Sequence, residues 1–62
     1  MINDVIRDVM INNRKTIDDV ARMTGYSHKL ISDIVLKDVT PRTEEAYRIL
    51  NCMNVNLGEL LR

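Results

Sequence analysis

The side chains that most often perform catalysis or bind metal ions are scarce in this chain of 62 residues. It has one histidine, His28, and one cysteine, Cys52, so an intramolecular disulfide is impossible and a zinc site built from these two residues alone is implausible. His28 has no partner in a recognisable catalytic arrangement, and the chain has no glycine-rich phosphate loop. We therefore expect no enzyme, no metal and no cofactor, and we expect Cys52 to be a small apolar residue in or near the core.

The most informative pattern lies at about residues 17–36, where two short helices are expected to meet through a tight turn. Ala21 stands four positions before Gly25, and apolar residues follow at Ile31 and Ile34. A small residue such as Ala21 allows close helix packing, and Gly25 can take a left-handed backbone that a β-carbon would disfavour. The two isoleucines can anchor the second helix on the first. The segment therefore predicts a helix-turn-helix motif.

The elements that must position this motif can be predicted from apolar periodicity and capping residues. A stripe with the period of a helix predicts a first helix and consists of Ile2, Val5, Ile6, Val9 and Met10. Thr16, followed by Asp19 three residues later, predicts the capped start of a second helix that Gly25 ends. Ser27 predicts the cap of a third helix over residues 28–36.

The remaining signals predict two further helices. Pro41 excludes helix at Thr40, and Thr43 is expected to cap a fourth helix that ends before a left-handed Asn54. The inner side of that helix is expected to comprise Ala46, Tyr47, Ile49, Leu50 and Met53. Asn56 and Glu59 repeat the capping pattern before a short fifth helix that carries Leu57, Leu60 and Leu61.

The composition favours helices packed on helices. Apolar residues make up 45% of the chain, but Phe and Trp are absent, so the core must be built from Ile, Leu, Val and Met. We expect an all-α fold of five short helices in a single domain over residues 1–62. No apolar run is long enough to cross a bilayer and no secretory signal is visible, so we expect a cytoplasmic protein.

The charges of the chain balance, with nine basic and nine acidic side chains. Residues 14–43 nevertheless hold six basic side chains against four acidic ones, a local balance of +2 that coincides with the predicted motif. The basic side chains are Arg14, Lys15, Arg22, Lys29, Lys37 and Arg42. The excess is small, and these residues are also compatible with an ordinary solvated surface.

Three stretches of the chain match one family pattern: T-I-D-D-V-A-R-M-T-G-Y-S-H-K-L-I-S-D-I, then T-P-R-T, then A-Y-R-I-L-N-C-M-N-V-N-L-G-E-L-L. With the leading helix, they resemble the lambda-repressor-like, Cro-type helix-turn-helix family of phage and bacterial transcriptional regulators. The resemblance implies a compact five-helix bundle. It also implies a sequence-specific DNA-binding repressor, encoded by a phage or a mobile element, whose helix 28–36 enters the major groove of double-stranded DNA.

The resemblance also implies which side chains meet DNA. The outward positions of helix 28–36 would face the bases and are His28, Lys29, Ser32 and Asp33. A lysine can donate to guanine, and a carboxylate can accept from cytosine N4 although phosphate repels it. Asp33 is also spaced to pair with Lys29 or Lys37 on the helix surface. Contacts to phosphate are expected from Arg14, Lys15, Thr16, Ser27, Lys37 and Arg42.

One recognition helix reads only a few base pairs, so we expect a homodimer on a pseudo-palindromic operator with half-sites about 10 base pairs apart. The expected dimer interface consists of Leu36, Val39, Val55, Asn56, Leu57 and Leu61. No membrane and no small-molecule ligand is expected as a partner.

The stretch of residues 36–40 departs from the family pattern, since it lacks glycine, has one basic residue and carries the apolar residues Leu36 and Val39 where polar groups are usual. These features favour an alternative, a protein-interaction module such as an antirepressor or partner subunit without strong DNA binding.

Overall fold

The computed structural model describes residues 1–55 and contains four helices in that range. They are α1 (Ile2–Asn12), α2 (Ile17–Thr24), α3 (His28–Leu36) and α4 (Thr43–Cys52). No strand occurs among these residues, so the all-α prediction is confirmed. The predicted fifth helix, with Asn56, Leu57, Leu60 and Leu61, lies outside the described residues.

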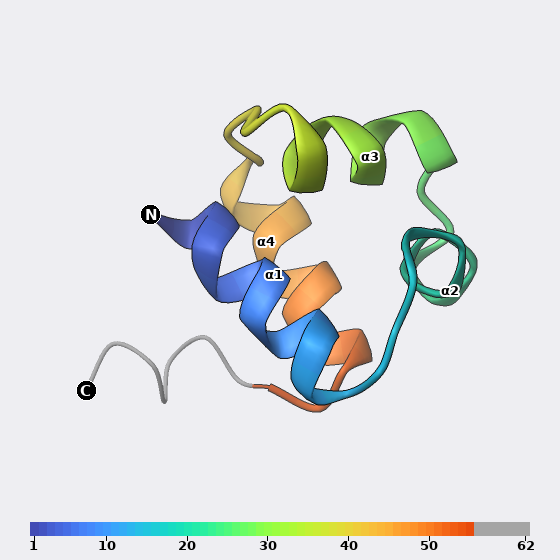
Figure 1. Cartoon of the computed structure of the whole chain (residues 1–62). Coiled ribbons are helices and arrows are strands. Elements are labelled where there is room, and N and C mark those ends of the chain that lie inside the picture. Colours follow the sequence, from blue (N-terminus) through green and yellow to red (C-terminus); the bar gives the residue numbers. More distant parts are fainter. Residues whose placement is uncertain (56–62) are drawn as a thin grey trace.

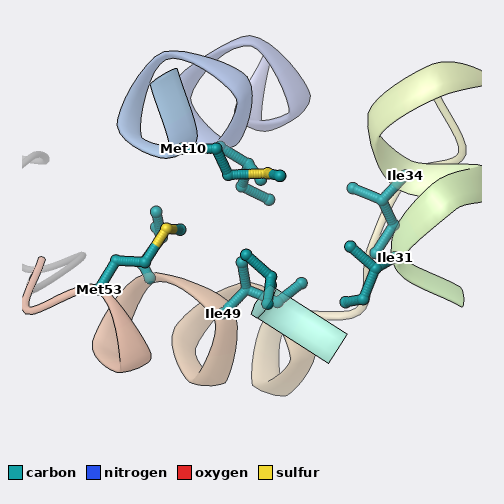
Figure 2. Packing of buried hydrophobic residues seen from close by; sticks show 8 residues of the cluster. Met10, Ile31, Ile34, Ile49 and Met53 are labelled. Carbon is teal, nitrogen blue, oxygen red and sulfur yellow. The ribbon is translucent and has the colours of Figure 1, made fainter. Parts of the chain in front are cut away.

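The four helices enclose one apolar centre. Helix α1 packs against α3 and α4, and α2 packs against the same two helices from the other side. In Figure 1, α3 lies across one end of the α1–α4 pair, and α2 lies below the N-terminal end of α3. The cluster at this centre draws buried apolar side chains from all four helices and from the residue after α4: Ile6, Met10, Val20, Ile31, Ile34, Ile49, Leu50 and Met53. Figure 2 shows how members of this cluster from α1, α3 and α4 point toward a common centre. The core is thus aliphatic and thioether in character, as the composition predicts.

The predicted boundaries of α2 and α3 are confirmed at the level of single hydrogen bonds. The Thr16 hydroxyl accepts the Asp19 amide at 3.1 Å, and the Asp19 carboxylate accepts the Thr16 amide at 2.9 Å. The Ser27 hydroxyl accepts the Leu30 amide at 3.1 Å and so caps α3. Gly25 ends α2 at φ 81°, and Asn54 follows α4 at φ 63°, so both predicted left-handed residues are confirmed. The turn between α2 and α3 is therefore fixed by local chemistry on both sides.

Two predicted details of α4 are wrong. Thr43 is already inside the helix, and the N-cap is Arg42, whose amide donates to the Glu45 carboxylate at 2.8 Å. This register places an acceptor at the third helical position, where a cap at Thr43 would have placed Ala46, which has none. Tyr47 is exposed and does not point inward. The buried face of the helix is already filled by Ala46, Ile49, Leu50 and Met53, which follow the helical spacing.

The end of α3 is held by side chains from α1. Asn3 is fully buried, and its Nδ2 donates to the carbonyl oxygens of Ile34 at 3.0 Å and Val39 at 2.9 Å. One turn later, Arg7 Nη1 donates to the carbonyl oxygen of Val35 at 2.9 Å. The last carbonyls of a helix have no partner within the helix, so α1 supplies the missing donors for α3. We call Asn3 and Arg7 the α1 clamp.

The α1 clamp was not predicted, although Asn3 does leave a sequence signal. It precedes Ile6 by three residues and Met10 by seven, and it therefore lies on the apolar stripe of α1. A polar residue on such a stripe is buried and must find partners in another element. What it bonds to could not be predicted, because its partners lie more than thirty residues away in the sequence.

Replacing Asn3 by Ala is expected to lower the free energy of unfolding by about 1–3 kcal/mol, because the buried carbonyl of Ile34 and the partly buried carbonyl of Val39 lose their donor. Urea unfolding followed by circular dichroism measures the change. Asn12→Ala is the matched control, since Asn12 is an exposed asparagine at the other end of the same helix. Equal stability of the two variants would show that the α1 clamp contributes nothing.

Candidate nucleic-acid interface

The outer face of α3 presents hydrogen-bonding side chains. Ile31 and Ile34 point into the core, and the four residues that the sequence assigns to base contact all lie outside it. His28 and Lys29 are exposed, and Ser32 and Asp33 are half-buried. The face therefore offers donors at its N-terminal end and a hydroxyl and a carboxylate near its middle.

Lys29 and Asp33 form an ion pair along this face. Lys29 Nζ lies 2.8 Å from Asp33 Oδ2, and Lys37 Nζ lies 3.8 Å from the other carboxylate oxygen. The hydrogen bond from Lys29 lowers the pKa of Asp33, and the same bond raises the pKa of Lys29. The carboxylate is thus held in its charged form between two lysines.

A second pair connects the starts of the two motif helices. His28 Nε2, at the beginning of α3, lies 3.1 Å from Asp18 Oδ1 in the first turn of α2. The imidazole can donate this hydrogen bond in either protonation state, and the pair carries opposite charges only when His28 is protonated. The sequence did not predict this contact, because it joins two helices whose angle the spacing alone does not define.

Each acidic side chain of residues 14–43 has a basic partner nearby. Two of these pairs are those of Asp18 with His28 and of Asp33 with Lys29. In the other two, Asp19 Oδ1 lies 2.6 Å from Arg22 Nη2, and Asp38 Oδ1 lies 2.6 Å from Nη1 of Arg7 in the α1 clamp. Among residues 1–55, three basic side chains of the same segment have no carboxylate within ion-pair distance: Arg14, Lys15 and Arg42. The motif therefore pairs its negative charges and leaves cations in the loops before α2 and α4.

The residues predicted to contact phosphate surround the motif in the chain. Arg14, at φ 55°, and Lys15 lie in the loop between α1 and α2, Lys37 follows α3, and Arg42 precedes α4. The hydroxyls of Thr16 and Ser27 already accept capping hydrogen bonds. Lys15 lies in the vicinity of Cys52, where its charge partly offsets the rise in the thiol pKa caused by burial. Cys52 itself packs against the core, as predicted.

The residues predicted to form a dimer interface fall into three groups. Leu36 and Val39 are exposed, by 69% and 49%, at the end of α3 and in the following loop. Val55 is half-buried and packs against the core of its own chain. Asn56, Leu57 and Leu61 lie outside the described residues.

The comparison with known families agrees with this geometry. The family model described as helix-turn-helix matches residues 6–60, which is most of the chain. The chain belongs to the lambda-repressor-like helix-turn-helix family. Members of this family are DNA-binding regulators, and their motif corresponds here to α2, the turn at Gly25 and α3. No curated protein and no solved structure matches the chain.

Within the family motif, a contact from α4 supports the turn between the two helices. The Arg48 guanidinium lies 5.6 Å from the centre of the Tyr26 ring, and it also donates to the Thr24 carbonyl oxygen at 3.5 Å. The Thr24 hydroxyl in turn accepts the Tyr26 amide at 3.2 Å. These contacts connect the turn to the rest of the bundle and so help to fix the angle between α2 and α3.

Among residues 1–55, no helix has the length and apolarity needed to cross a membrane.

Lowering the pH is expected to weaken the start of α2. The Thr16 amide donates a hydrogen bond to the Asp19 carboxylate and thereby holds the pKa of that carboxyl below its ordinary value. A carboxyl group of this kind contributes stability above its unfolded-state pKa, and the contribution is lost as pH falls through the lower folded-state pKa. Unfolding midpoints in urea measured from about pH 5 to about pH 2 should therefore fall more steeply for the wild type than for Asp19→Asn. Parallel curves would contradict this role for Asp19.

Proposed function

We propose that this protein is a sequence-specific transcriptional regulator of the Cro or repressor type, which binds its operator by placing α3 in the major groove. Membership of the family supports DNA binding as such. One observation carries the finer proposal: α3 turns four hydrogen-bonding side chains outward, while cations without carboxylate partners lie in the loops on either side of the motif. Such an arrangement separates base reading from phosphate binding. The operator would be bound in the cytoplasm or nucleoid of a bacterial host.

The proposed base contacts are those of His28, Lys29, Ser32 and Asp33. Lys29 is the strongest donor among them, because it carries a positive charge and its side chain is 83% exposed. Guanine offers it two acceptors, O6 and N7, on the floor of the major groove. His28 and Ser32 can each donate or accept, so they are compatible with several bases.

The proposed phosphate contacts position α3 without reading sequence. Arg14, Lys15, Lys37 and Arg42 supply charge, and Thr16 and Ser27 lie at the N-termini of α2 and α3, where backbone amides favour anions. Few cations are involved, so the affinity for random DNA should be low and its salt dependence shallow.

A homodimer is proposed because one short recognition helix covers only part of a groove. Two copies related by a two-fold axis would place their α3 helices one turn of DNA apart, on a pseudo-palindromic operator. Leu36 and Val39, at the end of α3, together with the segment Val55, Asn56, Leu57 and Leu61, are the proposed dimer contacts. Exposed apolar side chains next to the recognition helix would bring its two copies together.

The same exposure of Leu36 and Val39 supports the second candidate, an interaction module that binds another protein and has no strong affinity for DNA. A salt titration distinguishes the two. Binding to duplex DNA whose log affinity falls with log salt concentration supports the regulator. Absence of binding to any duplex at low salt, with tight binding to a protein partner, supports the module.

Replacing Lys29 by Ala should reduce affinity for the operator by about 10-fold or more and affinity for random duplex far less, because a base contact is lost. The operator is first obtained by selecting bound sequences from a random duplex pool, and a pseudo-palindromic consensus is expected. Fluorescence anisotropy then measures both affinities. Arg42→Ala is the comparison variant, and it should weaken both duplexes equally because it contacts phosphate. Equal losses on both duplexes for Lys29→Ala would remove its role in base reading.

A further inference from the structure

The ion pair between Lys29 and Asp33 places a donor and an acceptor side by side on the outer face of α3. The two groups are 2.8 Å apart, and they differ strongly in exposure, with Lys29 at 83% and Asp33 at 21%. Asp33 therefore lies close against the helix with Lys37 on its other side, while the ammonium group of Lys29 extends to meet it. The carboxylate is consequently held in place by two lysines.

This pair has little value for folding, since exposed ion pairs along a helix contribute little stability. A carboxylate on the face proposed to enter the groove is also repelled by the DNA phosphates. The Asp33 carboxylate therefore lowers the affinity of the protein for every DNA sequence that offers it no hydrogen-bond donor. A base that offers a donor beside an acceptor would turn the same group from a repulsive contact into an attractive one.

The edges of the two base pairs differ in where that donor lies. Across the major groove, a G·C pair presents the acceptors N7 and O6 of guanine and then the N4 amino group of cytosine. An A·T pair presents N7, then the N6 amino group, then the acceptor O4 of thymine. The donor is thus at the end of the polar row in G·C and between two acceptors in A·T.

We infer that Lys29 and Asp33 together read a single G·C base pair, with the ammonium on guanine O6 and N7 and the carboxylate on cytosine N4. The inference rests on the proposed function, which puts α3 in the major groove. The separation of 2.8 Å in the protein matches the distance of about 2.9 Å between the hydrogen-bonded O6 and N4 atoms of the base pair. The two protein groups can therefore meet the two base atoms side by side.

The geometry favours G·C over A·T on electrostatic grounds. On G·C, the carboxylate has an acceptor on one side only, and the ammonium group covers that acceptor. On A·T, the carboxylate would stand over N6 with acceptors on both sides, of which one ammonium group can cover only one. Asp33 thus provides specificity by penalising the wrong base pair, in addition to its contact with the right one.

The test begins with selection from a random duplex pool, carried out with the wild type and with Asp33→Asn. The wild-type consensus should contain a G·C pair that Asp33→Asn no longer requires. Loss of the negative charge should also raise the variant's affinity for random duplex. Asp8→Asn is the charge-matched control, because Asp8 is an exposed carboxylate of α1 without an ion-pair partner among residues 1–55. This control should keep the wild-type consensus.

An atomic substitution in the DNA then tests the contact itself. The cytosine of that pair is replaced by an analogue without the N4 amino group, and affinities are measured by fluorescence anisotropy. The analogue should lower the affinity of the wild type by about 10-fold or more. It should hardly change the affinity of Asp33→Ala, which already lacks the carboxylate. Circular dichroism checks that the variants are folded.

The results separate this inference from the proposed function. If Asp33→Asn selects the same consensus as the wild type, the reading of G·C is overturned and the proposed regulator remains. The same holds if the cytosine analogue lowers the affinity of the wild type and of Asp33→Ala equally. A consensus with A·T at the position that depends on Asp33 overturns it equally. Failure of the wild type to prefer any duplex overturns the proposed function and this inference together.

Discussion

The position of α3 depends on the α1 clamp, which supplies donors to the last carbonyl groups of that helix. A helix of nine residues is too short to be stable alone, so its orientation comes from its neighbours. Ile31 and Ile34 bind one face to the core, Ser27 caps the start, and Asn3 and Arg7 supply donors to the end. This role of Asn3 carries an energetic cost, because its buried Oδ1 has no hydrogen-bond partner among residues 1–55. A buried polar group thus helps to hold the end of α3 in place, while Ile31 and Ile34 determine which face of the helix is buried.

The equal numbers of acidic and basic residues conceal an uneven arrangement. The acids of the motif each face a basic side chain, and the pairs at His28 and Lys29 lie on the side that we propose faces DNA. Pairing of this kind reduces the general attraction to phosphate. The paired side chains still present hydrogen-bonding groups on this face, and the DNA sequence determines whether their contacts with the bases are favourable. Net neutrality therefore fits a protein that gains selectivity at the expense of affinity for random DNA.

Local chemistry was readable from the sequence, and contacts between elements were not. The caps at Thr16 and Ser27, the turn at Gly25 and the apolar stripes depend on spacing within a few residues, so the sequence predicts α2 and α3 closely. The start of α4 was misplaced because two neighbouring residues compete for the cap and Glu45 decides between them. The α1 clamp, the Asp18–His28 pair and the support of Tyr26 by Arg48 join distant segments. They follow only from the angles at which the helices pack.

Amide chemical-shift mapping by NMR, during titration with the selected duplex, tests the central claim most directly. The account predicts that the largest changes occur along the outer face of α3, from His28 to Asp33, and at the start of α2. Smaller changes are expected at Arg14 and Arg42, and the buried face of α4 should hardly respond. Saturating duplex that leaves α3 unperturbed, or changes confined to Leu36 and Val39, would contradict the placement of α3 in the major groove.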